Sequence, residues 1–539
     1  MTFKFTLLSC LVTFAIGLLS LFCLKLYNAR KFFRQLQSQD LPMPPHHWLL
    51  GHLSLAAQIT KSLAPYAAGG YIADQVRQRY PDLNAAFYLD VWPFSRPVLA
   101  ILDPDMMHQL TQQGKEVAKD PGLRTFLQPL TGKEDLVTME GATWKRWRSI
   151  FNPGFSANHI TSLIPDMVDK VLVFRDILAG KAQSGELFHL EQLTLKLTID
   201  IIGGAVMDHE FHSQTRHNRM TAALRRQLQW CTMGIEMNPL DNLKNFIRPI
   251  VHAYNTSIMN KYLTHELEQR YSSVLDQQHN PGKSVIDLAL KAYVDEYPNS
   301  NGIPAPFKSA AMAQIKLFIF AGHDTTSTAT VFTFHLLYKH PEVLKRLREE
   351  HDAVLGPTAD VPSRLASKPR LLNQLTYTLA SIKEALRIYP TVSTIRNGEP
   401  DLHLSGPDGR RFPTENCMIW GDHYSNHHNP RVWDRPEEYL PERWLCAEGD
   451  PLYPPKHAWR PFEKGPRNCI GQELALTEIK IILALTIRDF DILDAYAEFD
   501  KANGGSMDRK VNRQRAYMVR IGGGGHPADG YPCRARSLA

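Results

Sequence analysis

The chain has 539 residues, of which 43% are hydrophobic and 22% charged, as is ordinary for a folded globular protein. Its net charge of +6 suits an anionic membrane face or an acidic partner, but is too small to indicate nucleic-acid binding. The seven cysteines are scattered and form no CxxC pair, which argues against a disulfide framework or a cysteine-rich zinc site. We therefore expect the main body to reside in the reducing cytosol.

An apolar segment without charge or proline runs from Phe5 to Leu24 near the start of the chain. As a helix it would be about 30 Å long, the thickness of one bilayer core. Basic residues gather after this segment rather than before it, which places the N-terminus in the lumen. We expect a lumenal segment at 1–4 and a transmembrane anchor at 5–26. A cleaved signal peptide is the alternative, disfavoured because the apolar run is longer than usual and lacks a cleavage pattern.

Residues 27–51 are expected to link the anchor to the body through a proline-rich hinge, although an ordinary loop fits nearly as well. Residues 52–539 read as one mainly α-helical domain with a small β-region. Helical periodicity marks 158–181, 212–275, 307–340 and 472–487, and strands are expected at Asn84–Leu89, Val98–Leu102 and Tyr517–Ile521. The glycine run Gly522–Gly525 is no phosphate loop, because no Lys-Ser/Thr pair and helix follow it.

The stretch FEKGPRNCIG contains a lone cysteine, Cys469, shortly before an apolar helical segment. The positive end of that helix is expected to favour the thiolate. Gly465 and Gly471 let the loop bend tightly and a flat ligand approach, and Arg467 offers a fork of donors for a carboxylate. These properties suit an axial thiolate ligand of haem iron. A buried structural cysteine and a catalytic nucleophile are the alternatives.

This stretch, Phe462 to Gly471, resembles the haem-binding signature of the cytochrome P450 family, Phe-x-x-Gly-x-Arg-x-Cys-x-Gly, at every specified position. The resemblance extends over nearly the whole chain and implies the P450 fold behind an N-terminal transmembrane helix. It implies haem b with Cys469 as the proximal iron ligand. Phe462 would then shield the sulfur, Arg467 would meet a haem propionate, and Gly465 and Gly471 would shape the loop.

A second motif, AGHDTT from Ala321 to Thr326, interrupts an apolar helix with polar residues. Such residues compete with helical hydrogen bonds, and Gly322 weakens the helix and would leave room above a flat ligand. A local helix distortion would open a pocket for dioxygen and water. The motif resembles the family's oxygen-activation segment, which makes Thr325 and Asp324 the catalytic hydroxyl and the gate of a proton relay. A polar face toward a neighbouring helix is the alternative.

Two further motifs follow the family pattern. Glu384 and Arg387 lie three apart on a helix, and Arg443 comes from the segment PERW. The resemblance implies that these three form a buried structural network, whereas an exposed ion pair is the alternative. Trp144 and Arg148 resemble the family's Trp-x-x-x-Arg pair at a haem propionate, and Arg396 is a further candidate contact.

The resemblance implies a haem-thiolate monooxygenase that hydroxylates or epoxidises an apolar organic molecule. The motifs resemble those of fungal enzymes that act on secondary metabolites. Electrons would come from NADPH through the membrane-bound NADPH–cytochrome reductase, and the enzyme would lie in the endoplasmic reticulum membrane, facing the cytosol. A basic face for the reductase is expected from Lys145, Arg146 and Lys464, which otherwise form an ordinary solvated surface. The expected pocket residues are Leu123, Phe126, Trp230, Met233, Phe320, Val392 and Ile395. A haem-thiolate isomerase or dehydratase and a non-enzymatic haem scaffold or sensor remain alternatives.

Overall fold

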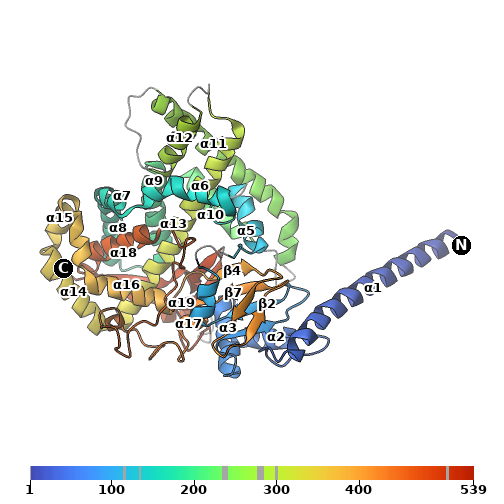
Figure 1. The fold of residues 1–539 in the computed structure, drawn as a ribbon. Helices are drawn as coiled ribbons and strands as arrows, with labels where there is room; N and C mark the ends of the chain where they lie inside the picture. Colours follow the sequence, from blue (N-terminus) through green and yellow to red (C-terminus); the bar gives the residue numbers. More distant parts are fainter. Residues whose placement is uncertain are drawn as a thin grey trace.

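The computed structural model describes residues 2–112, 117–132, 135–232, 241–275, 284–297, 302–504, 509–521 and 523–538. Helices dominate these segments, and short strands form a small β-region beside them (Figure 1). The α-helices are α1 Thr2–Ser38, α2 Leu53–Ser62, α3 Gly69–Arg79, α4 Pro104–Gln109, α5 Pro121–Thr131, α6 Gly141–Phe151, α7 Ala157–Ser162, α8 Ile164–Ser184, α9 Leu190–Met207, α10 Arg219–Trp230, α11 Arg248–Leu275, α12 Val285–Glu296, α13 Ala305–Lys339, α14 Pro341–Leu355, α15 Val361–Ser367, α16 Thr376–Ile388, α17 His423–His427, α18 Gln472–Thr486 and α19 Tyr496–Ala502.

The β-region consists of four small sheets in the described part of the chain. The strands are β1 Ala86–Leu89, β2 Val98–Ile101, β3 Phe188–His189, β4 Thr394–Asn397, β5 His403–Ser405, β6 Arg411–Pro413, β7 Met418–Gly421, β8 Phe490–Asp494, β9 Met518–Ile521, β10 Gly524–Pro527 and β11 Pro532–Ser537. The largest sheet has the order β1-β2-β7-β4, in which only β2 and β7 are parallel. It lies on the side of the body from which α1 projects (Figure 1).

The expected elements agree with the structure in kind and differ at their ends. The helix expected at 307–340 is α13, and that expected at 472–487 is α18. The helix expected at 158–181 is divided at Leu163, because Pro165 in the first turn of α8 cannot donate to the preceding helix. The segment 212–275 contains α10 and α11 as separate helices. The three expected strands are β1, β2 and β9, each within two residues of its expected bounds.

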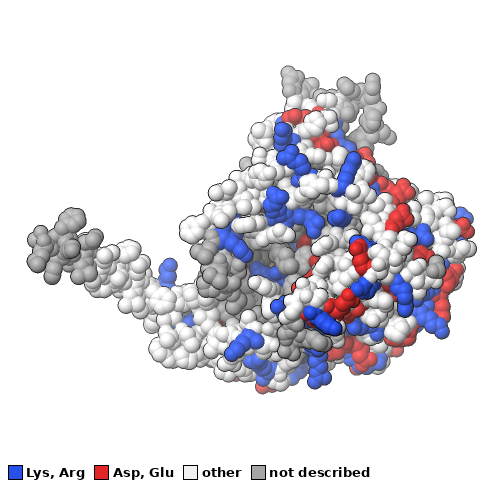
Figure 2. Space-filling model, turned by 180° about the vertical axis from the view of Figure 1, so that it is seen from behind, with Lys and Arg blue, Asp and Glu red and all other residues white. Residues whose placement is uncertain are grey.

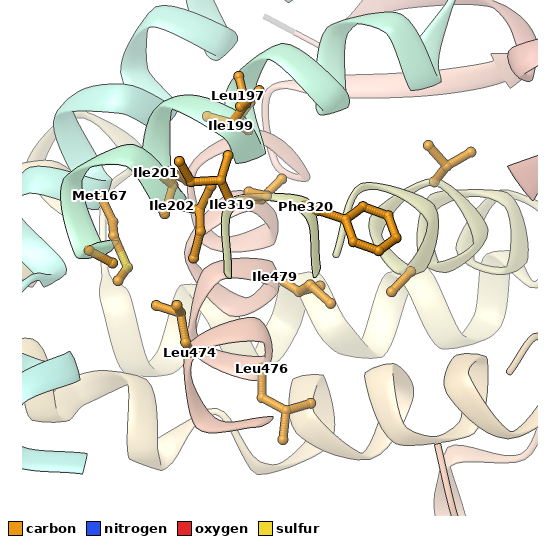
Figure 3. Packing of buried hydrophobic residues seen from close by; sticks show 14 of the residues in the cluster. Met167, Leu197, Ile199, Ile201, Ile202, Ile319, Phe320, Leu474, Leu476 and Ile479 are labelled. Atoms are coloured by element: carbon orange, nitrogen blue, oxygen red, sulfur yellow. The ribbon is translucent and has the colours of Figure 1, made fainter. Parts of the chain in front are cut away.

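Helix α13 runs through the middle of the core and packs along α9 (Figure 1). Apolar side chains of α9, α13 and α18 interdigitate there, among them Ile202, Ile319 and Ile479 (Figure 3). Gly322 permits the close approach, because a Cβ at that position would lie 2.6 Å from the side chain of Ile202. The missing side chain therefore serves helix packing, and the expectation that it leaves room for a flat ligand was wrong.

Helix α1 is continuous from the apolar segment into the globular body. Among the described residues it is the one helix long and apolar enough to cross a membrane, with the qualifying span at Cys10–Ser38. Its last turns belong to the body, because Phe33 and Leu36 are buried there. The Arg30 guanidinium pairs with Asp90 and also donates to the Leu49 carbonyl at 2.7 Å. The first part of the segment expected as a linker is therefore helix.

The proline-rich segment that follows α1 is tied to the body by its carbonyls. The Tyr88 N–H donates to the Pro42 carbonyl at 3.0 Å, and His52 Nε2 lies 2.9 Å from the Pro44 carbonyl. Both contacts fix the path of the chain between α1 and the β1-β2-β7-β4 sheet.

The rear face of the body is hollowed, with basic and uncharged side chains along much of the rim (Figure 2).

Candidate active site

The loop that carries Cys469 is held by its own backbone. The Cys469 N–H donates to the Phe462 carbonyl at 2.8 Å, and the Asn468 N–H donates to the Gly465 carbonyl at 3.1 Å. Gly465 has a φ of +79°, and a Cβ there would lie 2.0 Å from the Thr111 carbonyl oxygen. The turn therefore requires glycine on two grounds, conformation and close approach. The loop presents Cys469 in a fixed position.

The sulfur of Cys469 borders an internal space. Its side chain is accessible although the residue lies deep in the body. Burial raises the pKa of the thiol, and the Gly471 N–H and Arg148 only partly offset this effect. Helix α18 begins at Gln472, after the Gly471 N-cap, so Cys469 lies outside its first turn. The N–H at the start of α18 thus acts in the expected direction, but burial outweighs it in the net pKa of the thiol.

Two of the predicted arginines brace the cysteine loop and the segment before α6. Arg148 donates to the Asn468 backbone carbonyl at 2.9 Å and to its side-chain oxygen at 3.0 Å. Arg467 pairs with Glu140, donates to the Met139 carbonyl at 2.7 Å and lies 4.8 Å from the ring centroid of Trp144. Trp144 is buried beneath this guanidinium. The structure thus brings Trp144, Arg148 and Arg467 to one side of Cys469.

Arg396 and Lys119 add positive charge beside Arg467. Arg396 is buried, and one nitrogen donates to the Val117 carbonyl at 3.0 Å, while its Nε has no hydrogen-bond partner among the described residues. Burial, followed by the charges of Arg396 and Arg467, lowers the pKa of Lys119 to about 7. Lys119 was missed as a site residue, because only its β-bridge to Arg396, far away in the sequence, brings it here. The structure thus gathers three cationic side chains here, next to the carboxylates of Glu140 and Glu463.

The polar turn of α13 leaves one face of this helix uncovered. Ala321 is exposed although the helix around it is buried, and Thr325 is half-buried next to it. Thr325 Oγ1 donates to the Ala321 carbonyl at 2.8 Å, so the hydroxyl is held on this exposed face. The helix is unbroken from Ala305 to Lys339, and the expected local distortion is not seen. Asp324 is buried on a different side of the turn, where His526 lies 3.3 Å from its Oδ2.

Several of the expected pocket residues gather around the glycine-rich hairpin of β9 and β10. The rings of Phe126 and Phe320 lie 6.3 Å apart between centroids, and a Cβ at Gly523 would contact both rings. A Cβ at Gly524 would lie 3.9 Å from the side chain of Val392. Leu123, Trp230 and Ile395 are half-buried, whereas Met233 lies outside the described residues. The lining that the structure brings together is apolar and aromatic.

Glu384, Arg387 and Arg443 meet in the fully buried core. Glu384 Oε1 lies 2.8 Å from Arg387 Nη2 and 3.0 Å from Arg443 Nε. Trp444 Nε1 donates to the other carboxylate oxygen at 3.1 Å. The three charged side chains have no solvent exposure, so the alternative of an exposed ion pair does not apply. The tryptophan of PERW thus has a polar contact that its aromatic character alone did not predict.

The cytochrome P450 family model matches residues 42–503. The chain belongs to the cytochrome P450 family. It is 51% identical to cytochrome P450 monooxygenase polC of Polytolypa hystricis, over 98% of this chain and 96% of that protein. It is 34% identical to cytochrome P450 monooxygenase acrF of Aspergillus aculeatus, over 82% of this chain and 91% of that protein. The solved cytochrome P450DA haem domain has a TM-score of 0.70 and 22% identity, covering 93% of this chain and 97% of that domain.

The residues of this P450 fit the haem that the family binds. Cys469 offers one sulfur beside Gly471, where a Cβ would lie 3.9 Å away and would stand next to the sulfur. The unpartnered Nε of buried Arg396 and the neighbouring cations suit the two propionates of a haem. The P450 is an enzyme that binds haem through a thiolate, and its family implies a reductase as redox partner.

We expect Glu384→Gln to destabilise this P450 by about 3 kcal/mol or more, because two buried guanidinium groups lose their counter-ion. The thermal unfolding midpoint of the full chain in detergent measures the effect. Glu349→Gln is the matched control, since Glu349 pairs at the surface with Lys345 and such pairs contribute about 1 kcal/mol or less. Equal unfolding midpoints for the two variants would contradict a structural role for the buried network.

Proposed function

We propose that this P450 is a membrane-anchored monooxygenase, which inserts one atom of dioxygen into an apolar organic substrate by hydroxylation or epoxidation. The observation that carries the proposal is the exposed Ala321–Thr325 face in the otherwise buried middle of α13, in a chain whose Cys469 side chain is also accessible. A thiolate site alone would suit several haem proteins. The buried acid Asp324 and the hydroxyl of Thr325 add what oxygen cleavage needs in this reaction, a path for protons.

Haem bound to the Cys469 thiolate supplies oxygen activation, because thiolate donation favours O–O cleavage. Arg396, Lys119 and Arg467 would hold its propionates. Arg148 holds the loop through Asn468 and so fixes the position of the sulfur. Thr325 Oγ1, which donates to the Ala321 carbonyl, would turn to donate its proton into the site. Asp324 would take a proton from water and pass it to Thr325 Oγ1, and the aromatic lining around Phe126 and Phe320 would exclude bulk water.

The electrons come from NADPH through a membrane-bound NADPH–cytochrome reductase that docks on the side of the cysteine loop. Lys145 on α6 is exposed and Lys464 in the loop is half-buried, so both can meet an acidic partner. Arg146 is already paired with Glu296 of α12. Lys145 is therefore a better residue than Arg146 at which to test docking of the reductase.

Helix α1 and the fungal relatives support the proposed location, orientation and class of substrate. With α1 as the anchor, residues 1–4 lie in the lumen and the catalytic domain from 52 to 539 faces the cytosol at the endoplasmic reticulum membrane. The basic residues after the apolar segment favour this orientation. The fungal relatives support oxidation of a secondary metabolite. The aromatic lining indicates an apolar molecule as substrate.

Replacing Cys469 by His tests the ligand directly. We expect the dithionite-reduced wild type with carbon monoxide to show the red-shifted Soret band of thiolate-bound haem, and Cys469→His to lose it. Cys446→Ser is the control, because the Cys446 thiol only donates to the Arg443 carbonyl. A wild-type spectrum typical of histidine ligation, or loss of the band in the control alone, would refute the assignment.

The proton path is tested at the polar turn of α13. Thr325→Val and Asp324→Asn should each lower product formation by roughly 100-fold, because each removes a group that carries the proton. Product formed per NADPH consumed is the measurement, with haem content checked in parallel. Thr330→Val is the matched control, since Thr330 makes the same type of bond, to the Thr326 carbonyl at 2.8 Å. Full coupling in both test variants would exclude the path.

The docking site is tested by charge reversal. We expect Lys145→Glu to slow reduction of the haem by the reductase several-fold at low salt without loss of haem, and added salt to narrow the difference. Stopped-flow absorbance with carbon monoxide measures the rate. Lys345→Glu, on exposed α14, is the control. Unchanged reduction kinetics for Lys145→Glu would place the reductase elsewhere.

A further inference from the structure

His526 lies between two carboxylates at the edge of the active site. Its Nδ1 is 2.6 Å from Glu191 Oε1 in the first turn of α9, and its Nε2 is 3.3 Å from Asp324 Oδ2 on α13. All three side chains are buried. A carboxylate only accepts hydrogen bonds, so an imidazole that satisfies both partners must carry a proton on each nitrogen. The arrangement is an imidazolium held between two acids.

The glycine-rich hairpin explains how His526 reaches Asp324. A Cβ at Gly524 would lie in ordinary contact range, 3.7 Å from Asp324 Oδ2 and 3.4 Å from the Thr391 carbonyl oxygen, so β10 passes directly beside Asp324. The Gly525 N–H donates to the same Thr391 carbonyl at 2.7 Å, which fixes strand β10 against the segment that carries Val392. His526 pairs with Val519 across the hairpin. The glycine run, which is no phosphate loop, thus brings a histidine to the proton-relay acid.

The charges around His526 favour the imidazolium form, with a proton on each ring nitrogen. Burial alone would lower the pKa of His526, but Asp324 and Glu191 raise it to about 10. Burial alone would raise the pKa of Asp324, but His526, with lesser contributions from His323 and Arg225, brings it below the usual value of 3.8. Arg225 comes from α10 and also faces Glu191. His323 has its Nδ1 2.8 Å from the Ile319 carbonyl, and burial lowers its pKa.

We propose that His526 is a positioning residue for Asp324: it clamps the carboxylate to the β10 hairpin, and proton delivery through Asp324 requires this contact to open. The proposal rests on the relay role of Asp324 in the proposed function. In the clamped state one oxygen of Asp324 is committed to His526, away from the exposed face that carries Thr325. Opening frees that oxygen to receive a proton and pass it to Thr325 Oγ1, while His526 keeps its contact with Glu191.

The clamp persists across the neutral pH range. The raised pKa of His526 stabilises the fold fully below pH 6.5, and this stabilisation is lost as the pH rises through about 10. The lowered pKa of Asp324 stabilises the fold above pH 3.8, and this is lost as the pH falls below that value. Neither group titrates between these limits. Wild-type coupling of NADPH consumption to product should accordingly be flat between about pH 6 and pH 8.

The first measurement is pH-difference infrared spectroscopy of the haem-loaded full chain. In His526→Gln the neutral amide leaves Asp324 without its nearest cation, and its pKa should rise above the wild-type value. We expect the band of a protonated carboxylic acid to appear in this variant at a pH at which the wild type shows none. The band must disappear in the double variant His526→Gln/Asp324→Asn, which assigns it to Asp324.

The second measurement is the pH profile of hydrogen peroxide released per NADPH consumed. His526→Gln should acquire a pH dependence with the same apparent pKa as its infrared band, because Asp324 now titrates. His526→Lys restores a positive charge and should restore the flat wild-type profile. His335→Gln controls for loss of a buried histidine on α13, since His335 contacts Tyr531 at 3.2 Å rather than Asp324. It should also leave the profile flat.

Each outcome bears on the proposal. A folded His526→Gln with no carboxylic acid band and a flat profile would overturn it. If His526→Gln does not fold, His526→Lys tests the proposal instead. A new carboxylic acid band, or a new pH dependence of peroxide release, in His526→Lys would refute the clamp. The infrared result does not depend on turnover. A band that follows the prediction, together with full coupling in Asp324→Asn, would therefore contradict the proposed relay while leaving the clamp intact.

Discussion

The buried carboxylate of Glu384 is the interaction on which the rest of the structure depends. Its two oxygens accept from Arg387, Arg443 and Trp444, and thereby join α16 to the segment that leads into the cysteine loop. The cost of burying these charges is large and is offset only when every partner is in place. The geometry of Cys469 therefore depends on a network that itself makes no contact with the sulfur.

The polar turn of α13 likewise contains a buried charge that needs a partner. An acid in the middle of a core helix has to be paired or neutralised, and here the partner comes from a hairpin near the C-terminal end of the chain. The glycines of that hairpin and Gly322 act on opposite sides of α13, the former admitting a strand and the latter admitting α9. The helix is thus packed tightly on both sides, and its Ala321–Thr325 face stays open.

Local patterns predicted the features that depend on local chemistry. The cysteine motif, the apolar span of α1 and the helix spacing of Glu384 and Arg387 each lie within a short stretch of sequence. The family resemblance of these motifs implied the fold class. What the sequence could not predict depends on contacts between distant segments. Lys119 reaches Arg396, His526 reaches Asp324 and Arg146 reaches Glu296 only through the tertiary fold. Gly322 was misread because its neighbour, Ile202, belongs to another helix.

The continuity of α1 has a mechanical consequence. Because α1 runs without a break into the body and is fastened there by Arg30 and Phe33, no flexible joint separates its apolar part from the globular domain. With α1 in a bilayer, any tilt of the span would tilt the whole body and change the height of its openings above the lipid. Bilayer thickness, which sets the tilt of a long apolar span, would thereby govern whether an apolar molecule enters from the lipid or from water.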